Sequence, residues 1–135
     1  MAQSAIYVVN NSAQNVAVNG IINPGTIIRR YGRNLNLSGN AVQVAGEGYY
    51  DFDVSITLAP TAAGNVTVTA FKDGVAIPGM IASETVAAAN DLVNLSLVGL
   101  VREGCCCCDN LSAITFVLSG TAASVTNIAI VGEKI

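Results

Sequence analysis

The chain has 135 residues, of which 52% are hydrophobic and only 11% are charged, so intrinsic disorder is excluded. Nine Asp and Glu outnumber six Lys and Arg, which argues against a nucleic-acid-binding module because such modules need a basic surface. His is absent, so the commonest general base and metal ligand of proteins is missing. The length suits one core, and we predict a single domain over residues 1–135.

The first residues contain neither a basic segment nor a long apolar one. We therefore expect no secretory signal peptide, and we expect the protein to be made in the cytoplasm. The longest run without charged residues, 110–132, is interrupted throughout by Ser, Thr, Asn and Gly. A bilayer span needs roughly 20 mostly apolar residues, so no membrane association is expected.

The chain opens with a strand-like segment, residues 6–9, and its only basic cluster follows at Arg29, Arg30 and Arg33 around Tyr31. Together with the preceding Ile-Ile pair, the cluster is predicted to form a strand at the surface. Arg and Tyr are favoured in interface cores, so contact with an acidic partner or a neighbouring subunit is one interpretation. The other is a solvated sheet edge whose charges discourage aggregation.

Short strands are predicted around residues 35–37 and 42–44, separated by a Ser-Gly-Asn turn signal. The clearest pattern follows, because apolar side chains then take every second position at Tyr50, Phe52, Val54, Ile56 and Leu58. A period of 2 over this length indicates a strand, since helical apolar positions recur about every 3.6 residues.

Two carboxylates, Asp51 and Asp53, lie on the polar side of that strand. Their side chains point the same way, roughly 7 Å apart. That spacing suits a calcium ion shared between subunits or a glycosidase pair, and the alternative is a plain solvated polar strip. The absence of Trp makes a carbohydrate hydrolase a poor candidate.

A hairpin is predicted next: alternating residues 66–70 lead to Lys72-Asp73-Gly74, and Asp-Gly supplies the positive φ that such turns require. The return strand is expected over residues 75–77, stopped by Pro78-Gly79. Residues 81–94 could hold one helical turn, but a longer helix is opposed by Thr, Val and Asn. A further strand is predicted at 93–97, where apolar and polar residues alternate.

Four consecutive cysteines, Cys105 to Cys108, are the most conspicuous motif. Only Cys105 and Cys108 have the spacing of a zinc-ligand pair, and no His or second pair completes four ligands. The plain interpretation is a buried or half-buried strand of reduced cysteines in a cytosol. Disulfides between subunits, or a metal held across a threefold axis, are the alternatives.

The remaining strands are predicted around residues 114–118 and 128–130. Many short strands separated by turns, with no helical period, indicate an all-β sandwich or barrel.

Three stretches resemble the jelly-roll superfamily of tumour necrosis factor and the complement globular heads, in particular its bacterial and phage branch. The first is Gly48-Tyr49-Tyr50-x-Phe52-x-Val54-x-Ile56, similar to the glycine-aromatic strand that crosses the domain. The second, Val66 to Gly74, is similar to the family's hairpin, and the third, from residue 110 to Ile130, to its last two strands. The four cysteines depart from the family pattern.

The resemblance implies a jelly-roll β-sandwich of about 8 to 10 short antiparallel strands and a homotrimer whose inner sheet packs around a threefold axis. It implies no enzyme activity, which agrees with the lack of a catalytic serine motif. No cofactor is expected. The residues we single out as candidates for a subunit interface are Tyr50, Phe52, Arg29, Arg30, Tyr31 and Arg33.

We therefore expect a structural or adhesive protein of phage or prophage origin, such as a head fibre, a capsid decoration or a tail-associated component. Its partners would be copies of itself and other virion or cell-surface proteins. The alternative is a carbohydrate- or ligand-binding module, assisted by calcium at Asp51 and Asp53.

Overall fold

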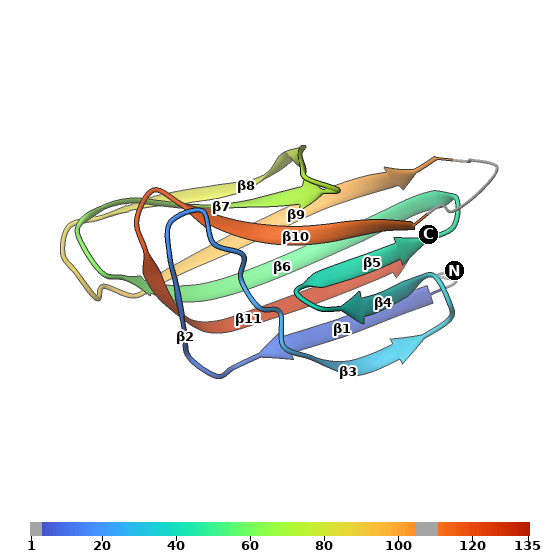
Figure 1. The fold of residues 1–135 in the computed structure, drawn as a ribbon, viewed down its shortest axis with the longest axis horizontal. Coiled ribbons are helices and arrows are strands. Elements are labelled where there is room, and N and C mark those ends of the chain that lie inside the picture. The colour runs from blue at the N-terminus through green and yellow to red at the C-terminus, as the bar shows by residue number, and fades with distance from the viewer. Residues whose placement is uncertain (1–3, 105–110) are drawn as a thin grey trace.

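The computed structural model describes residues 4–104 and 111–135, which form eleven β-strands and no helix (Figure 1). The strands make two antiparallel sheets that enclose a shared hydrophobic core. The predicted all-β sandwich is confirmed, with slightly more strands than the eight to ten expected because two of them, β2 and β4, are very short.

The six-stranded sheet has the order β3-β1-β11-β6-β9, and the short β2 pairs with β11 beside this path. Its strands are β1 (Ser4–Asn10), β2 (Gln14–Val16), β3 (Thr26–Tyr31), β6 (Gly48–Pro60), β9 (Val93–Glu103) and β11 (Ala123–Lys134).

The five-stranded sheet has the order β4-β5-β10-β7-β8. Its strands are β4 (Leu35–Ser38), β5 (Ala41–Ala45), β7 (Gly64–Lys72), β8 (Val75–Val86) and β10 (Leu111–Ser119). From β5 onward the chain crosses repeatedly between the two sheets, which is the connectivity of a jelly roll.

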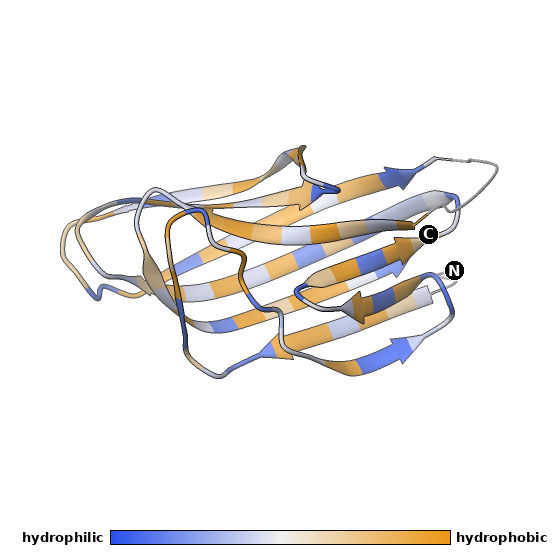
Figure 2. Ribbon diagram, viewed as in Figure 1, coloured by the Kyte–Doolittle hydropathy of each residue, from blue (hydrophilic) through white to orange (hydrophobic). Residues whose placement is uncertain are grey.

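The alternation along β6 sets the core. All five of its predicted inward residues are buried, and β6 pairs along its length with β11 on one side and β9 on the other. The same alternation appears as apolar and polar bands along the strands in Figure 2. Because inward residues of both sheets meet, the period of 2 produces one continuous core.

Two expectations for the middle of the chain are wrong. Pro78-Gly79 does not end β8, which continues to Val86 with a register shift opposite β7 between Thr69 and Phe71. β8 is an edge strand, where a missing N–H is tolerated, and Gly79 adopts a φ of 83° in the irregular stretch. The helical turn expected within residues 81–94 is absent, because these residues finish β8, turn and begin β9.

On one side of the sandwich, where β8 and β9 are the edges of the two sheets, a methionine packs against a glycine. Met80 of β8 occupies the space that a Cβ at Gly99 of β9 would take. Its side chain is fully buried and bridges the two sheets there. In the described ranges, no helix has the length and apolar character needed to span a membrane.

Candidate functional site

The outer face of the six-stranded sheet carries exposed apolar side chains. The strand registers place five residues in one row across this face: Arg29, Tyr7, Val131, Asp53 and Val98. Tyr7, Val131, Asp53 and Val98 alternate with residues that point into the core, so these four point away from it, and Arg29 shares their face because it is paired with Tyr7.

Exposure of the apolar members is high. The exposed fraction is 65% for Val98 and 58% for Leu100 on β9, and 44% for Val131 on β11. Tyr7 on β1 is 37% exposed. Apolar residues that lie together in this way across adjacent strands are a feature of surfaces that bind a partner.

Two hollows flank Tyr7 on the same face. The larger, of about 460 Å³, extends from Tyr7 across β11 and β6 to Val98. The smaller, of about 190 Å³, lies between Tyr7 and the β3 residues Arg29 and Tyr31. The face is therefore hollowed beside its central aromatic ring, while Val98 and Leu100 stand exposed at its β9 edge.

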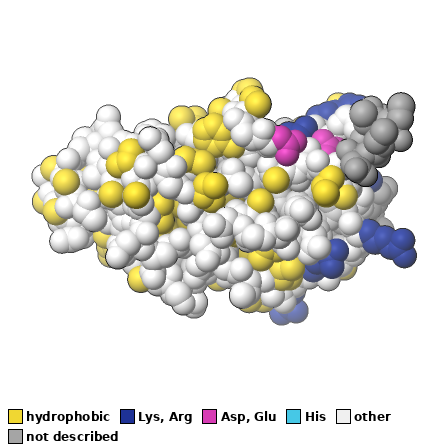
Figure 3. Space-filling model, viewed as in Figure 1, with side chains coloured by type: hydrophobic (Ala, Val, Ile, Leu, Met, Phe, Trp, Pro, Cys, Tyr) yellow, Lys and Arg dark blue, Asp and Glu magenta, His cyan; other side chains and the backbone are white. Residues whose placement is uncertain are grey.

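The outer face of the five-stranded sheet is different in chemistry. The registers of β7, β8 and β10 place the apolar Phe71, Ile81 and Val117 on it, among a larger set of hydroxyl and amide side chains: Asn65, Thr67, Thr69, Ser83, Thr85, Thr115 and Ser119. Some of them hydrogen-bond across strands, as Thr67 does with Ser83 at 2.7 Å. Figure 3 shows this side of the molecule, where hydrophobic atoms are scattered among polar ones.

The predicted carboxylates also lie on the outer face of the six-stranded sheet. Asp53 is exposed opposite Val131, and Asp51 is half-buried directly opposite Glu133 of β11. No group of three or more Asp, Glu, Cys or His side chains suited to a metal ion occurs within residues 4–104 and 111–135. A metal role for Asp51 and Asp53 stays a prediction, and Cys105 to Cys108 lie outside the described residues.

Tyr50 and Phe52, named above as interface candidates, point into this chain's own core and have no exposed surface. A neighbouring copy cannot reach them in this arrangement. The reason is that side chains alternate between the two faces of a strand. The apolar side of β6 faces the other sheet, and the opposite side, with Tyr49, Asp51 and Asp53, faces outward.

The basic cluster forms the predicted surface strand. Arg29, Arg30 and Tyr31 belong to β3, all six residues of which are exposed, and the exposed Arg33 follows in the turn. Arg30 donates a hydrogen bond from Nε to the carbonyl oxygen of Leu35 at 2.6 Å, which ties β3 to β4.

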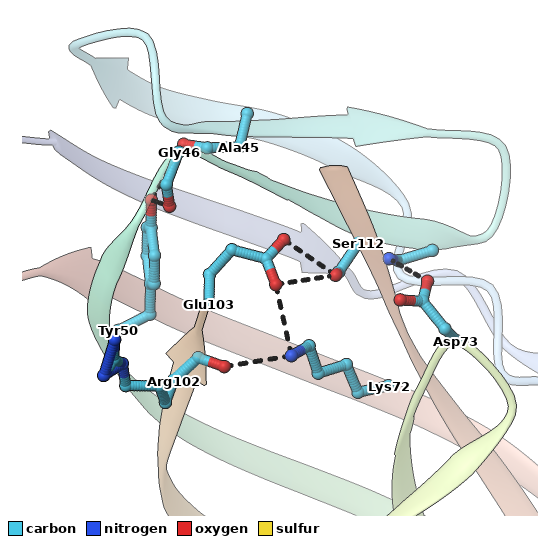
Figure 4. A network of polar contacts seen from close by, with 9 residues as sticks. Ala45, Gly46, Tyr50, Lys72, Asp73, Arg102, Glu103 and Ser112 are labelled. Carbon is cyan, nitrogen blue, oxygen red and sulfur yellow. Dashed lines mark hydrogen bonds and ion pairs between the residues drawn. The ribbon is translucent and has the colours of Figure 1, made fainter. Parts of the chain in front are cut away.

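A polar network, which the sequence analysis did not predict, joins the two sheets near the end of β9 (Figure 4). Glu103 is buried, with its Oε1 3.1 Å from Nζ of Lys72 on β7. The Ser112 hydroxyl lies 2.9 and 2.8 Å from its two carboxylate oxygens. Lys72 also donates to the carbonyl oxygen of Arg102 at 2.9 Å. The alternation along β9 could have indicated a buried Glu103, because this residue falls on the same side of the strand as the inward-pointing apolar residues.

The hydroxyl of Tyr50 lies at the same end of the sandwich. It is 2.8 Å from the carbonyl oxygens of both Ala45 and Gly46, to which it can donate. Burial raises the pKa of this hydroxyl above its usual value of 10.0; a hydrogen bond with Asn34 lowers it in part, and the Glu103 carboxylate raises it further. Tyr50 therefore anchors the β5–β6 connection in its neutral form.

A third hollow, of about 310 Å³, lies at the opposite end, between the end of β8 and the start of β9. It brings Glu84 and Asp91 to a polar surface depression. The sequence analysis had no signal for it, because the two carboxylates come from segments that only the turn after β8 brings together.

Comparison with known proteins identifies the fold. No protein-family model matches the sequence, and a search of curated proteins found no match. Among solved structures, murine APRIL aligns with a TM-score of 0.71 and 12% identity, over 96% of this chain and 98% of that one. The PRD1 vertex protein P5 aligns with a TM-score of 0.68 and 17% identity, over 100% and 99%. The Eiger TNF of S. frugiperda aligns with a TM-score of 0.67 and 11% identity, over 99% and 92%. The chain thus has the jelly-roll fold of the tumour necrosis factor-like and complement 1q-like heads.

Proposed function

We propose that this protein is a non-enzymatic structural or adhesive module that assembles as a homotrimer and forms part of a phage or prophage virion. The observation that carries the proposal is the outer face of the six-stranded sheet, with its exposed Tyr7, Val98, Leu100 and Val131. The outer face of the other sheet is richer in hydroxyl groups, although Ile81 is exposed among them, so the six-stranded sheet is the face that more strongly favours a partner.

A second copy is the partner that the shape favours. Val98 and Leu100 stand at the β9 edge of the face, whereas the larger hollow spans the middle of the face from Val98 to Tyr7 and the smaller one lies beyond Tyr7, beside β3. The edge of one copy can therefore pack into the hollowed part of the next. Such a head-to-tail contact uses two different patches and closes into a ring when the rotation between copies is right, here with three members.

Similarity in fold to the PRD1 vertex protein P5 supports the virion assignment, because the two chains align over essentially their whole lengths. A sandwich with little charge and many apolar strand residues suits a rigid body that packs against copies of itself. In this proposal the protein is made in the cytoplasm and is carried on the virion as a head fibre, capsid decoration or tail-associated component. Its loops then contact another virion or cell-surface protein.

The trimer is tested by sedimentation velocity over a range of concentrations, with a matched pair of variants. Val98→Asp places a charge in the proposed interface, directly opposite Asp53 of the same chain, and should shift the protein strongly toward monomer because the carboxylate would lose its hydration there. Val75→Asp makes the same change at a residue 70% exposed on the other sheet, where trimers should persist. A wild-type protein that stays monomeric at every concentration, or equal behaviour of the two variants, contradicts the proposal.

The virion assignment needs a separate measurement. Particles purified from a lysing culture of the source organism should contain this protein in stoichiometric amount by mass spectrometry, and capsid or tail genes should neighbour its gene. Absence from purified particles, with the protein abundant in the particle-free lysate, contradicts the assignment and leaves the trimer to be judged on its own test.

A further inference from the structure

β3 is an edge of the six-stranded sheet and is unusually accessible. Within the described part of the chain it pairs only with β1, so its other side presents unpaired backbone groups. Every side chain from Thr26 to Tyr31 is exposed. An edge of this kind can accept a further strand from another chain.

The charge of this edge is opposite to that of the protein. Three of the six Lys and Arg of a chain with net charge −3 are Arg29, Arg30 and Arg33. Within the described ranges, none of the three forms an ion pair with a carboxylate, whereas Lys72 and Arg102 both do. Figure 3 shows basic side chains gathered at the lower right, over the corner that β3 and the following turn form in Figure 1.

The two arginines of β3 flank the edge on opposite faces of the sheet. Arg29 is opposite Tyr7 and lies on the outer face, while Arg30 is opposite the inward-pointing Ile6. Arg30 uses its Nε on Leu35, and its terminal N–H groups are further donors. A guanidinium group is therefore offered on each side of a strand that would be added here.

Consecutive residues of an added strand also point to opposite faces, so two adjacent carboxylates would meet both guanidinium groups. A second copy cannot supply them, because this chain contains no two consecutive Asp or Glu residues. We infer that β3 docks an extended acidic segment of another protein by strand addition, with adjacent carboxylates pairing to Arg29 and Arg30. This site adjoins the proposed trimer contact, because Arg29 and Arg30 also line the smaller hollow beside Tyr7. It uses the free backbone edge of β3, however, so either proposal can fail alone.

The test uses fluorescence anisotropy with the full chain and a labelled peptide in which Glu-Glu is flanked by Val and Thr. A second peptide carries Lys-Lys in place of Glu-Glu, and a third keeps Glu-Glu but replaces the Val residues with Pro. The first should bind, more weakly as salt is raised. The second should not bind, and the third should bind far more weakly because proline removes strand hydrogen bonds.

Variants of the protein locate the site. Arg29→Glu alone, and Arg29→Ala with Arg30→Ala, should each weaken binding of the acidic peptide by roughly tenfold or more, since charge-assisted pairs are lost. Arg102→Ala removes an exposed arginine from β9, the opposite edge of the same sheet, and should leave binding unchanged. Circular dichroism and sedimentation confirm that the variants keep their fold and assembly.

Four results overturn the inference: no binding of the acidic peptide, equal binding of the proline peptide, equal effects of the β3 and Arg102 variants, or loss of trimers in Arg29→Glu. The last would make this edge a contact between copies. If polyphosphate competes fully while the proline peptide binds as well as the first, the edge is a general polyanion surface instead.

Discussion

At the scale of single residues, two glycines and a tyrosine show how tightly the core constrains the chain. Gly132 of β11 faces inward, between Ile6 and Phe52 on the neighbouring strands. A Cβ at this position would lie 2.6 Å from Cε1 of Phe52, whose ring is fully buried. Gly99 makes room for Met80 in the same way, but a methionine side chain is more adaptable than a ring.

We predict that Gly132→Ala destabilises the folded protein by about 1–3 kcal/mol, because the Phe52 ring has to move within a packed core. The control is Gly104→Ala, since a Cβ there meets nothing within 4 Å among residues 4–104 and 111–135. Denaturant unfolding at one fixed protein concentration measures both, as assembly would make stability depend on concentration. Equal stability of the two variants would show that the Phe52 ring can move aside at no cost in free energy.

Tyr50 gives the protein a predictable response to alkaline pH. Its folded-state pKa is raised, first of all by burial, so above about pH 10 the unfolded chain loses this proton while the folded protein keeps it. Under those conditions the folded state binds more protons, so the free energy of unfolding falls as pH rises.

The Tyr50 contribution is measured by comparing wild type with Tyr50→Phe. The slope of unfolding free energy against pH above about 10 should become shallower in the variant, although the loss of its hydrogen bonds lowers stability at every pH. The chain has four tyrosines, so the ionisation of Tyr50 is followed as the difference in tyrosinate absorbance between wild type and Tyr50→Phe. An unchanged slope in Tyr50→Phe would refute the assignment.

At the scale of elements, the β7–β8 turn shows local sequence acting directly. Asp73 and Gly74 both have positive φ, at 52° and 85°, as a two-residue hairpin turn requires. The turn is also held to β10, because the amide of Asp73 donates to the Ala113 carbonyl and its carboxylate accepts from the Ala113 amide, both at 2.9 Å.

Gly74→Ala should cost about 1–2 kcal/mol through backbone strain alone, since a side chain there meets no other atom within 4 Å. Asp73→Asn is the companion change and should be nearly neutral, because Asn tolerates positive φ and keeps the accepting oxygen. Thermal melting of both variants provides the measurement. A larger loss from Asp73→Asn than from Gly74→Ala would mean that the carboxylate charge, not the backbone, holds the turn.

Longer elements were less predictable. Pro78-Gly79 is a strong turn signal, yet β8 continues past it to Val86. The reason lies outside the segment: β8 pairs on one side only, and Met80 just beyond the irregular stretch is drawn into the core beside Gly99. Tertiary burial therefore outweighed a local breaker.

At the scale of the whole molecule, the two sheets present unlike faces to the exterior. Hydroxyl groups predominate on the outer face of the five-stranded sheet, and exposed apolar groups with the carboxylates of Asp51, Asp53 and Glu133 lie on that of the six-stranded sheet. Asp51 and Glu133 are directly opposite, an arrangement that is unfavourable for like charges. If a bound cation offsets the repulsion between these carboxylates, the calcium-assisted binding module is favoured; if none does, the structural module is favoured.

We predict that dialysis against a chelator leaves both the melting temperature and the sedimentation coefficient unchanged. Calcium takes six to eight oxygen ligands, and the outer face offers few from one copy. The comparison is made with and without added calcium, on wild type and on Asp53→Asn. A calcium-dependent rise in melting temperature that Asp53→Asn abolishes would establish a cation site and favour the binding module.

The all-β class, the inward face of β6 and the Asp73-Gly74 turn could be predicted from the order of residues, because a period of 2 and a left-handed turn are properties of neighbouring residues. The sequence also placed the basic residues of β3 at a surface. Which apolar residues remain exposed depends on how the two sheets pack against each other. Tyr50 and Phe52 are buried, while Val98 and Leu100, on an edge strand, are left exposed, and alternation alone cannot tell a face covered by the second sheet from one that is not. The pairing of Glu103 with Lys72 and Ser112 likewise depends on strands brought together from distant parts of the chain.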